Sequence, residues 1–170
     1  LTLSRRISDL IKMTKVNLIS CEHFEFRDTN LQSLVRESVA ICESSLDLNG
    51  TEIETDQVQS DLKIICSPLK ISQVFVNLIK NSFHAIQEQK EKWIRITASR
   101  NDQNLMITFT DSGDGIPEAI AKKIFQREFT TKTFGSGSGL GLSFCLHVIE
   151  EHGGTLTPVS YTHLTLPTRS

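Results

Sequence analysis

Apolar residues recur every three or four positions in several segments, and this spacing predicts amphipathic helices. The segment Asp28-Thr29-Asn30 offers capping residues to one helix, and Pro68 opens another. Gly153-Gly154 ends the last one. The predicted helices cover residues 1–20, 31–46, 68–89, 117–125 and 140–152.

Other segments alternate apolar and polar residues, which predicts strands with one buried face. Asn101-Asp102-Gln103-Asn104 joins two of them as a hairpin. Mixed strands and helices around a central meander predict an α/β sandwich, in which helices cover one sheet. The predicted strands are residues 23–27, 51–55, 62–66, 93–99 and 105–110.

Size and composition set limits on the class of protein. A chain of 170 residues forms one ordinary globular domain. The net charge of −2 gives no reason to expect nucleic acid or an anionic membrane as a partner, and the apolar runs are too short for a membrane segment. The four scattered cysteines are typical of buried, reduced thiols in a cytoplasmic protein.

The helix that begins at Pro68 carries an unusual polar face. Asn77, Asn81, His84 and Glu88 lie opposite its apolar residues. An isolated pair of asparagines is usually the solvent side of an amphipathic helix. Amide oxygens nevertheless suit a Mg²⁺ ion whose charge is balanced mainly by phosphates.

Asp111 ends a predicted strand and begins Asp-Ser-Gly-Asp-Gly. Such a segment is commonly a turn, because Gly tolerates positive φ and Asp bonds to the nearby backbone. The functional interpretation is that Asp111 accepts a hydrogen bond from the exocyclic amine of a base. Gly113 and Gly115 would then let the chain pass close to the ring.

A second glycine-rich segment precedes the last helix. Gly137, Gly139 and Gly141 lie where free N–H groups and the helix dipole favour an anion, although a flexible linker has a similar composition. Lys132 and Arg127 are usually surface residues, but beside a triphosphate they would neutralise charge. P-loop, dinucleotide-binding and eukaryotic protein kinase motifs are absent from the sequence.

These segments resemble, in order, four motifs of sensor histidine kinases. Asn77–Ala85 resembles the N box, Asp111–Pro117 the G1 box, Ile124–Lys132 the F box and Gly137–Ser143 the G2 box. The resemblance covers about residues 24–157. It implies the ATP-binding fold shared with the gyrase B-subunit, heat-shock chaperones and mismatch-repair ATPases. That fold is an α/β (α+β) two-layer sandwich, whose mixed, mainly antiparallel sheet has about three helices on one face and a mobile ATP lid.

The resemblance also implies roles for individual residues. Asn81, with Asn77, holds Mg²⁺, Asp111 binds adenine, and residues 126–138 form the lid. Lys132, His84 and Arg127 face the phosphates. The other residues implied to line the ATP site are Gly113, Gly115, Ile116, Thr131, Gly137, Ser138, Gly139, Leu140 and Gly141.

Position 77 distinguishes branches of this family. The related ATPases carry a water-activating Glu there, whereas Asn77 is neutral and a poor base. This favours phosphoryl transfer to a histidine supplied from elsewhere. Three alternatives remain at this point: an ATPase of the gyrase–chaperone branch, a serine kinase of the anti-sigma type, and a non-catalytic nucleotide-sensing module.

The histidines at 23, 84, 147, 152 and 163 all lie outside the family's phosphoacceptor setting. Residues 1–22 resemble the second helix of the dimerisation and phosphoacceptor hairpin, and residues 23–158 the catalytic domain. The implied partners are that hairpin, a response-regulator receiver domain and a second copy bound through the N-terminal helix. By this interpretation the chain binds nucleotide without phosphorylating itself.

Two features depart from the family pattern. Glu128 stands where the F box often has Phe. Residues 159–170 resemble a vector- or adapter-derived tail, which would replace the native last strand and leave a sheet edge to be covered. The alternative is that Tyr161–Leu166 is itself the family's last strand.

Overall fold

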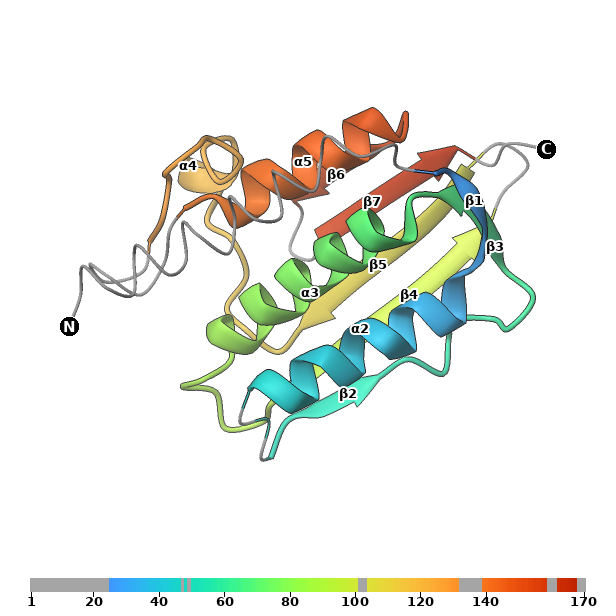
Figure 1. Cartoon of the computed structure of the whole chain (residues 1–170). Coiled ribbons are helices and arrows are strands. Elements are labelled where there is room, and N and C mark those ends of the chain that lie inside the picture. The colour runs from blue at the N-terminus through green and yellow to red at the C-terminus, as the bar shows by residue number, and fades with distance from the viewer. Residues whose placement is uncertain are drawn as a thin grey trace.

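A computed structural model describes residues 25–46, 48, 50–100, 104–131, 139–158 and 162–167 (Figure 1). In this part of the chain the helices are α2 (Leu31–Ser45), α3 (Pro68–Ala85), α4 (Glu118–Ala121) and α5 (Gly141–Glu151). The strands are β1 (Arg27–Asn30), β2 (Glu52–Glu54), β3 (Lys63–Cys66), β4 (Trp93–Arg100), β5 (Asn104–Asp111), β6 (Thr155–Pro158) and β7 (Thr162–Pro167).

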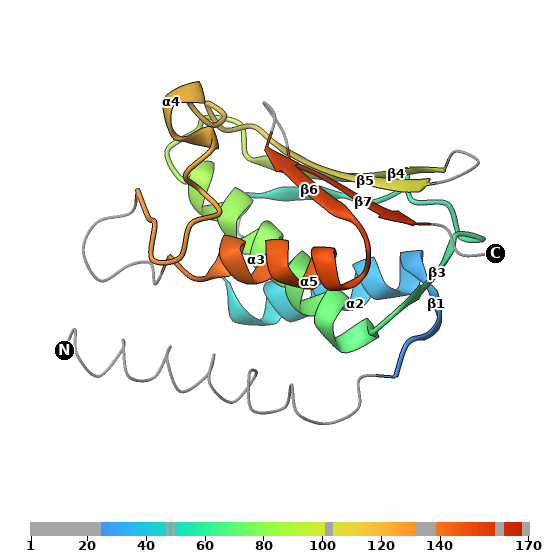
Figure 2. The ribbon, with the colours of Figure 1, turned by 90° about the horizontal axis from the view of Figure 1, so that it is seen from above.

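The main sheet has the strand order β2-β4-β5-β7-β6. β2 pairs with β4 in parallel, and the other pairs are antiparallel. β1 and β3 form a separate antiparallel pair. α2, α3 and α5 all lie on one side of the main sheet, as Figure 2 shows from above. The predicted two-layer α/β sandwich with a mixed, mainly antiparallel sheet is therefore confirmed.

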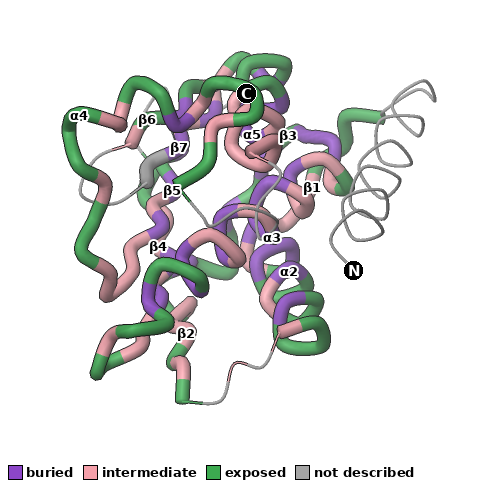
Figure 3. The backbone as a smooth tube through the Cα atoms, turned by 90° about the vertical axis from the view of Figure 1, so that its left-hand side faces the viewer, coloured by how far each residue is buried: buried purple, intermediate pink, exposed green. Residues whose placement is uncertain are grey.

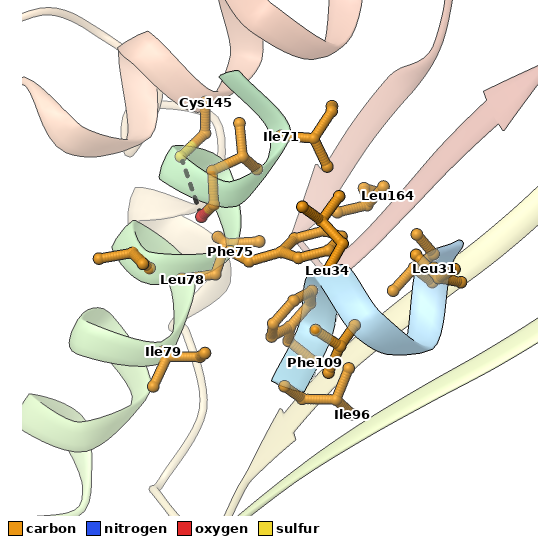
Figure 4. Packing of buried hydrophobic residues seen from close by; sticks show 14 of the residues in the cluster. Leu31, Leu34, Ile71, Phe75, Leu78, Ile79, Ile96, Phe109, Cys145 and Leu164 are labelled. Carbon is orange, nitrogen blue, oxygen red and sulfur yellow. Dashed lines mark hydrogen bonds between the residues drawn. The ribbon is translucent and has the colours of Figure 1, made fainter. Parts of the chain in front are cut away.

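The core lies between α2, α3 and α5 and the inner face of the main sheet, to which β4 and β5 contribute. Alternate residues of these strands point toward the helices and are buried, as the period of a strand requires. The rings of Phe75 on α3 and Phe109 on β5 lie 5.5 Å apart between centroids. Figure 3 shows the buried stretches gathered between the layers, and Figure 4 shows their packing. The predicted apolar face of α3 is buried throughout: Val74, Phe75, Leu78, Ile79, Phe83 and Ile86.

The ends of α3 and α5 are tied together by a buried histidine. The backbone N–H of Ser67, which precedes α3, donates to Nε2 of His152 over 3.1 Å. Nδ1 of the same ring lies 2.7 Å from the carbonyl oxygen of Val148 and donates to it. Since Nε2 accepts, the ring is neutral with its proton on Nδ1. The two helices that carry the candidate site thus share a fixed junction.

Several predicted boundaries moved. α3 ends at Ala85, four residues before the expected Gln89. The strand expected at residues 23–27 begins at Arg27 and continues to Asn30, whose side chain caps α2 by accepting from the N–H of Ser33. The expected helix over residues 1–20 and the turn at 101–103 lie outside the described residues.

The segment after β6 forms the strand that the second interpretation of the tail predicted. β7 lies between β5 and β6, so it pairs on both sides. Its Leu164 and Leu166 are buried in the core. The origin of residues 159–170 stays a prediction. Among the residues with described structure, no helix is both long and apolar enough to cross a membrane.

Candidate functional site

The polar face of α3 carries the two candidate metal-binding amides. Asn77 and Asn81 are half-buried, one helical turn apart, while His84 near the end of the helix is exposed. α3 packs against α5 on one side and β5 beneath it. The asparagines therefore lie on the helix that packs against both elements next to the other two candidate segments.

The side chain of Asn77 lies against the start of α5. A Cβ atom added to Gly141 would stand 3.9 Å from Oδ1 of Asn77, and Nδ2 lies farther away. Nδ2 is buried and has no hydrogen-bond partner within the described structure. The amide thus turns its oxygen toward the first turn of α5.

Cys145 on α5 lies close to the Asn77 side chain. Its thiol donates to the carbonyl oxygen of Val74 over 3.9 Å, the dashed line in Figure 4. Burial raises the pKa of the Cys145 thiol to about 12, and the nearby Asn77 side chain offsets this only in part. Cys145 is therefore a neutral packing residue rather than a nucleophile.

Asp111 lies near the C-terminal end of α3. By strand alternation its side chain is on the helix-facing side of β5, with Leu105, Ile107 and Phe109. The N–H of Gly113 donates to Oδ1 of Asp111 over 3.0 Å. A Cβ atom at Gly113 would approach that oxygen to 2.9 Å and Cβ of Ala85 to 3.4 Å. The carboxylate therefore sits beside the last residue of α3, against a position where a side chain would crowd it.

An open hollow of about 620 Å³ flanks this carboxylate. On one side it is bordered by the segment that follows α3, and on the other by the turn that follows β5. Its lining residues are Glu88, Gln89, Lys90, Glu91, Trp93, Asp111, Ser112 and Gly113.

Glu128 and Gly139 hold the two ends of the predicted lid together. The N–H of Glu128 donates to the carbonyl oxygen of Gly139 over 3.1 Å. A Cβ atom at Gly139 would lie 2.4 Å from the backbone carbon of Glu128, so only glycine fits. Glu128 is exposed and has φ 65°, a backbone conformation that is uncommon for residues other than glycine. The unusual feature of this position is therefore its backbone and not the packing of its side chain.

The first turn of α5 presents backbone rather than side chains. Within the described ranges no side chain caps the helix at Leu140, and the hydroxyl of Ser143 donates to the Leu140 carbonyl oxygen over 3.0 Å. A Cβ atom at Gly141 would make only ordinary contacts, so packing does not require glycine there. The N–H groups that begin a helix, together with the absence of a side chain at Gly141, suit a bound anion.

The structure brings some predicted site residues together and leaves others unplaced. Asp111 and Gly113 meet one end of α3, Asn77 meets Gly141, and Gly139 meets the segment after Arg127. Ile116 is half-buried, whereas Gly115, Arg127 and Thr131 are exposed. Lys132, Gly137 and Ser138 lie outside the described residues.

Ser112 and Gln89 are two polar residues next to the candidate site that the sequence did not single out. Their partners, Glu91, Trp93 and Asp114, lie 19 to 25 residues away in the chain. A serine in a turn is an ordinary turn residue by local pattern. Only the pairing of β4 with β5 makes these contacts visible.

A metal ion at this site would depend on neutral ligands. Across the described ranges, His, Cys, Asp and Glu do not form a group of three or more that could hold a metal. The amide oxygens of Asn77 and Asn81 could serve as ligands to Mg²⁺, which prefers oxygen. Such a site fits an ion whose charge is balanced chiefly by its ligand's phosphates.

Residues 66–169 match the family model described as histidine kinase-, DNA gyrase B-, and HSP90-like ATPase. The chain belongs to this family. It is 32% identical to the sensor histidine kinase ZraS of Escherichia coli (strain K12) over 160 residues, which is 93% of this chain and 32% of ZraS. It is 31% identical to sporulation kinase B of Bacillus subtilis (strain 168) over 151 residues, 89% of this chain and 33% of that kinase. The chain spans about a third of the length of these two relatives.

Solved histidine kinases share the fold of this family member. The catalytic domain of histidine kinase ThkA, free of nucleotide, superposes with a TM-score of 0.71 at 33% identity, covering 84% of this chain and 95% of that one. ThkA in complex with response regulator TrrA has a TM-score of 0.71 at 28% identity and covers 98% of this chain and 49% of ThkA. The chain is thus an ATP-binding catalytic domain homologous to those of sensor kinases.

Proposed function

We propose that this chain binds Mg²⁺-ATP along α3 and serves as the catalytic domain of a two-component sensor histidine kinase. It transfers the γ-phosphoryl group to a histidine on a phosphoacceptor helix outside the sequence described here. Asp111 accepts a hydrogen bond from the exocyclic amine of adenine, and the first turn of α5 binds the phosphates.

The spacing of two contacts on α3 carries this proposal. Ala85 meets the turn after Asp111, and Asn77 meets Gly141. Eight residues separate them, which is about 12 Å along a helix. An extended nucleotide lying over α3 would place its base at one contact and its phosphates at the other.

The chain's own residues explain why transfer is favoured over hydrolysis. When bound, Mg²⁺ supplies charge neutralisation for the phosphates. Asn77 and Asn81 would hold the ion, and the N–H groups at the start of α5 would orient the phosphate oxygens. Asn77 is a neutral amide and cannot take a proton from water, so the site lacks the base that hydrolysis needs at that position. Positioning and charge neutralisation are sufficient for phosphoryl transfer.

We further infer the partners from the same function. The complex of ThkA with TrrA supports a response-regulator receiver domain as a partner of the parent kinase. The phosphoacceptor hairpin is the substrate, and residues 1–22 would contribute to a homodimer through that hairpin. A domain that consumes ATP in this way acts in the cytoplasm.

The experiment supplies the parent kinase's acceptor hairpin as a separate chain, together with Mg²⁺ and γ-labelled ATP. We expect an acid-labile phosphohistidine on the hairpin, which Asp111→Asn strongly reduces. Steady phosphate release without acceptor would instead indicate an ATPase. An acid-stable phosphoserine would indicate a serine kinase, and binding without transfer would indicate a nucleotide-sensing module.

A further inference from the structure

Ser112 joins the turn after β5 to the segment between α3 and β4. Its hydroxyl donates to the carbonyl oxygen of Glu91 over 2.7 Å and accepts from the N–H of Trp93 over 3.2 Å. Its own N–H donates to the Trp93 carbonyl oxygen over 3.1 Å. This half-buried serine therefore uses both its donor and its acceptor capacity to hold one turn against another.

A further hydrogen bond links the same two segments. Nε2 of Gln89 donates to Oδ1 of Asp114 over 3.1 Å. Ser112 and Asp114 flank Gly113, whose N–H donates to Asp111. The turn that fixes the Asp111 carboxylate is thus tied on both sides of Gly113 to residues 89–93.

We propose that Ser112 is a positioning residue, which sets the place of the Asp111 carboxylate and thereby the preference for adenine over other purines. The proposal rests on the proposed function, since it assumes that Asp111 accepts the exocyclic amine. Ser112 itself need not touch the nucleotide. The strength of a hydrogen bond changes when its length changes by a few tenths of an ångström. A loosened turn therefore weakens the bond to the amine more than the contacts to the phosphates.

The test compares affinities for ATP and inosine triphosphate, which has a carbonyl in place of the exocyclic amine. We expect Ser112→Ala to raise the Kd for ATP about three- to tenfold, the range that one or two lost positioning hydrogen bonds produce. The Kd for inosine triphosphate changes little, because that ligand lacks the exocyclic amine whose hydrogen bond Asp111 accepts. The Kd for inosine triphosphate divided by the Kd for ATP therefore falls, and Ser112→Thr, which keeps the hydroxyl, restores this ratio.

Ser44→Ala is the matched control, because its hydroxyl also donates to a backbone carbonyl, that of Ile41 over 2.9 Å, on α2. It leaves both Kd values unchanged. If Ser112→Ala does not fold, Gln89→Ala removes the second bond and is expected to lower the same ratio to a smaller extent.

Two results overturn the proposal. One is a Ser112→Ala variant that binds ATP as the wild type does. The other is an equal loss of affinity for both nucleotides, which would show a general role in the turn. A wild-type chain that binds neither nucleotide overturns the proposed function as well, so the two failures are distinguishable.

Discussion

Gly154→Ala tests whether β7 lies in the sheet where the structure places it. A Cβ atom at Gly154 would stand 2.0 Å from the carbonyl oxygen of Thr165 on β7, and 3.1 Å from side-chain atoms of Ile149 and Leu166. Real Cβ atoms stay at least 3.0 Å from such a neighbour, so β7 would have to move by about 1 Å. That strand is hydrogen-bonded on both sides and cannot move without disturbing β5 and β6.

The size of the effect follows from this contact. Overpacking a well-packed core costs typically about 1–3 kcal/mol. Because the obstacle is a backbone oxygen in a central strand, we expect the upper end, about 3 kcal/mol. Gly153→Ala is the matched control: its φ of 72° imposes strain, but its nearest contact, Pro167 Cγ at 3.5 Å, is ordinary. Left-handed backbone costs an alanine about 1 kcal/mol here.

Urea unfolding of both variants and of the wild type measures the difference. Trp93 is the sequence's one tryptophan, and its fluorescence together with circular dichroism reports the transition. A difference of about 2 kcal/mol between the variants corresponds to about 1 M urea for a domain of this size. If Gly154→Ala unfolds at the same urea concentration as Gly153→Ala, residues 162–167 do not occupy this place in the sheet.

Three other substitutions test separate parts of the account. Burial lowers the pKa of His152 below its ordinary 6.5, so its contribution to stability is complete above that pH and falls as the pH drops below it. His152→Gln should lower stability by about 1–3 kcal/mol at pH 7 and flatten the loss between pH 7 and 5, measured by urea unfolding. An unchanged pH dependence would argue against a buried neutral ring at this position. Gly113→Ala should weaken ATP binding in a calorimetric titration by displacing the Asp111 carboxylate, and unchanged affinity would contradict the close contact. Glu128→Gly should raise stability by about 0.5–1 kcal/mol by relieving its positive φ; a lower melting temperature would argue against strain there.

Local patterns predicted the elements whose two faces differ in polarity. α3 shows this clearly, because its buried apolar stripe and its polar face with Asn77 and Asn81 are both visible at helical spacing. The segment Asp28-Thr29-Asn30 was predicted to supply a cap, and Asn30 supplies it, since a cap depends only on neighbours in the chain. The family model and the solved kinases confirmed the resemblance that the four ordered motifs indicated.

Features that depend on distant pairing were harder to predict. Alternation in residues 161–166 fitted a strand, but its place between β5 and β6 depends on pairing partners that sequence spacing does not reveal. The bonds of Ser112 likewise depend on how β4 and β5 align. α3 ends early at Ala85, since the backbone of Ile86 is no longer helical at φ −98° and ψ 5°, although its buried side chain continues the apolar spacing.

We propose above that α3, the turn at Asp111 and the start of α5 form one site for Mg²⁺-ATP. A calorimetric titration of a non-hydrolysable ATP analogue, with and without Mg²⁺, tests it most directly when it includes wild type, Asn81→Ala and Asp111→Asn. We predict that Asn81→Ala loses the part of the affinity that depends on Mg²⁺, and that Asp111→Asn loses affinity under both conditions. Wild-type affinity in both variants would contradict the claim.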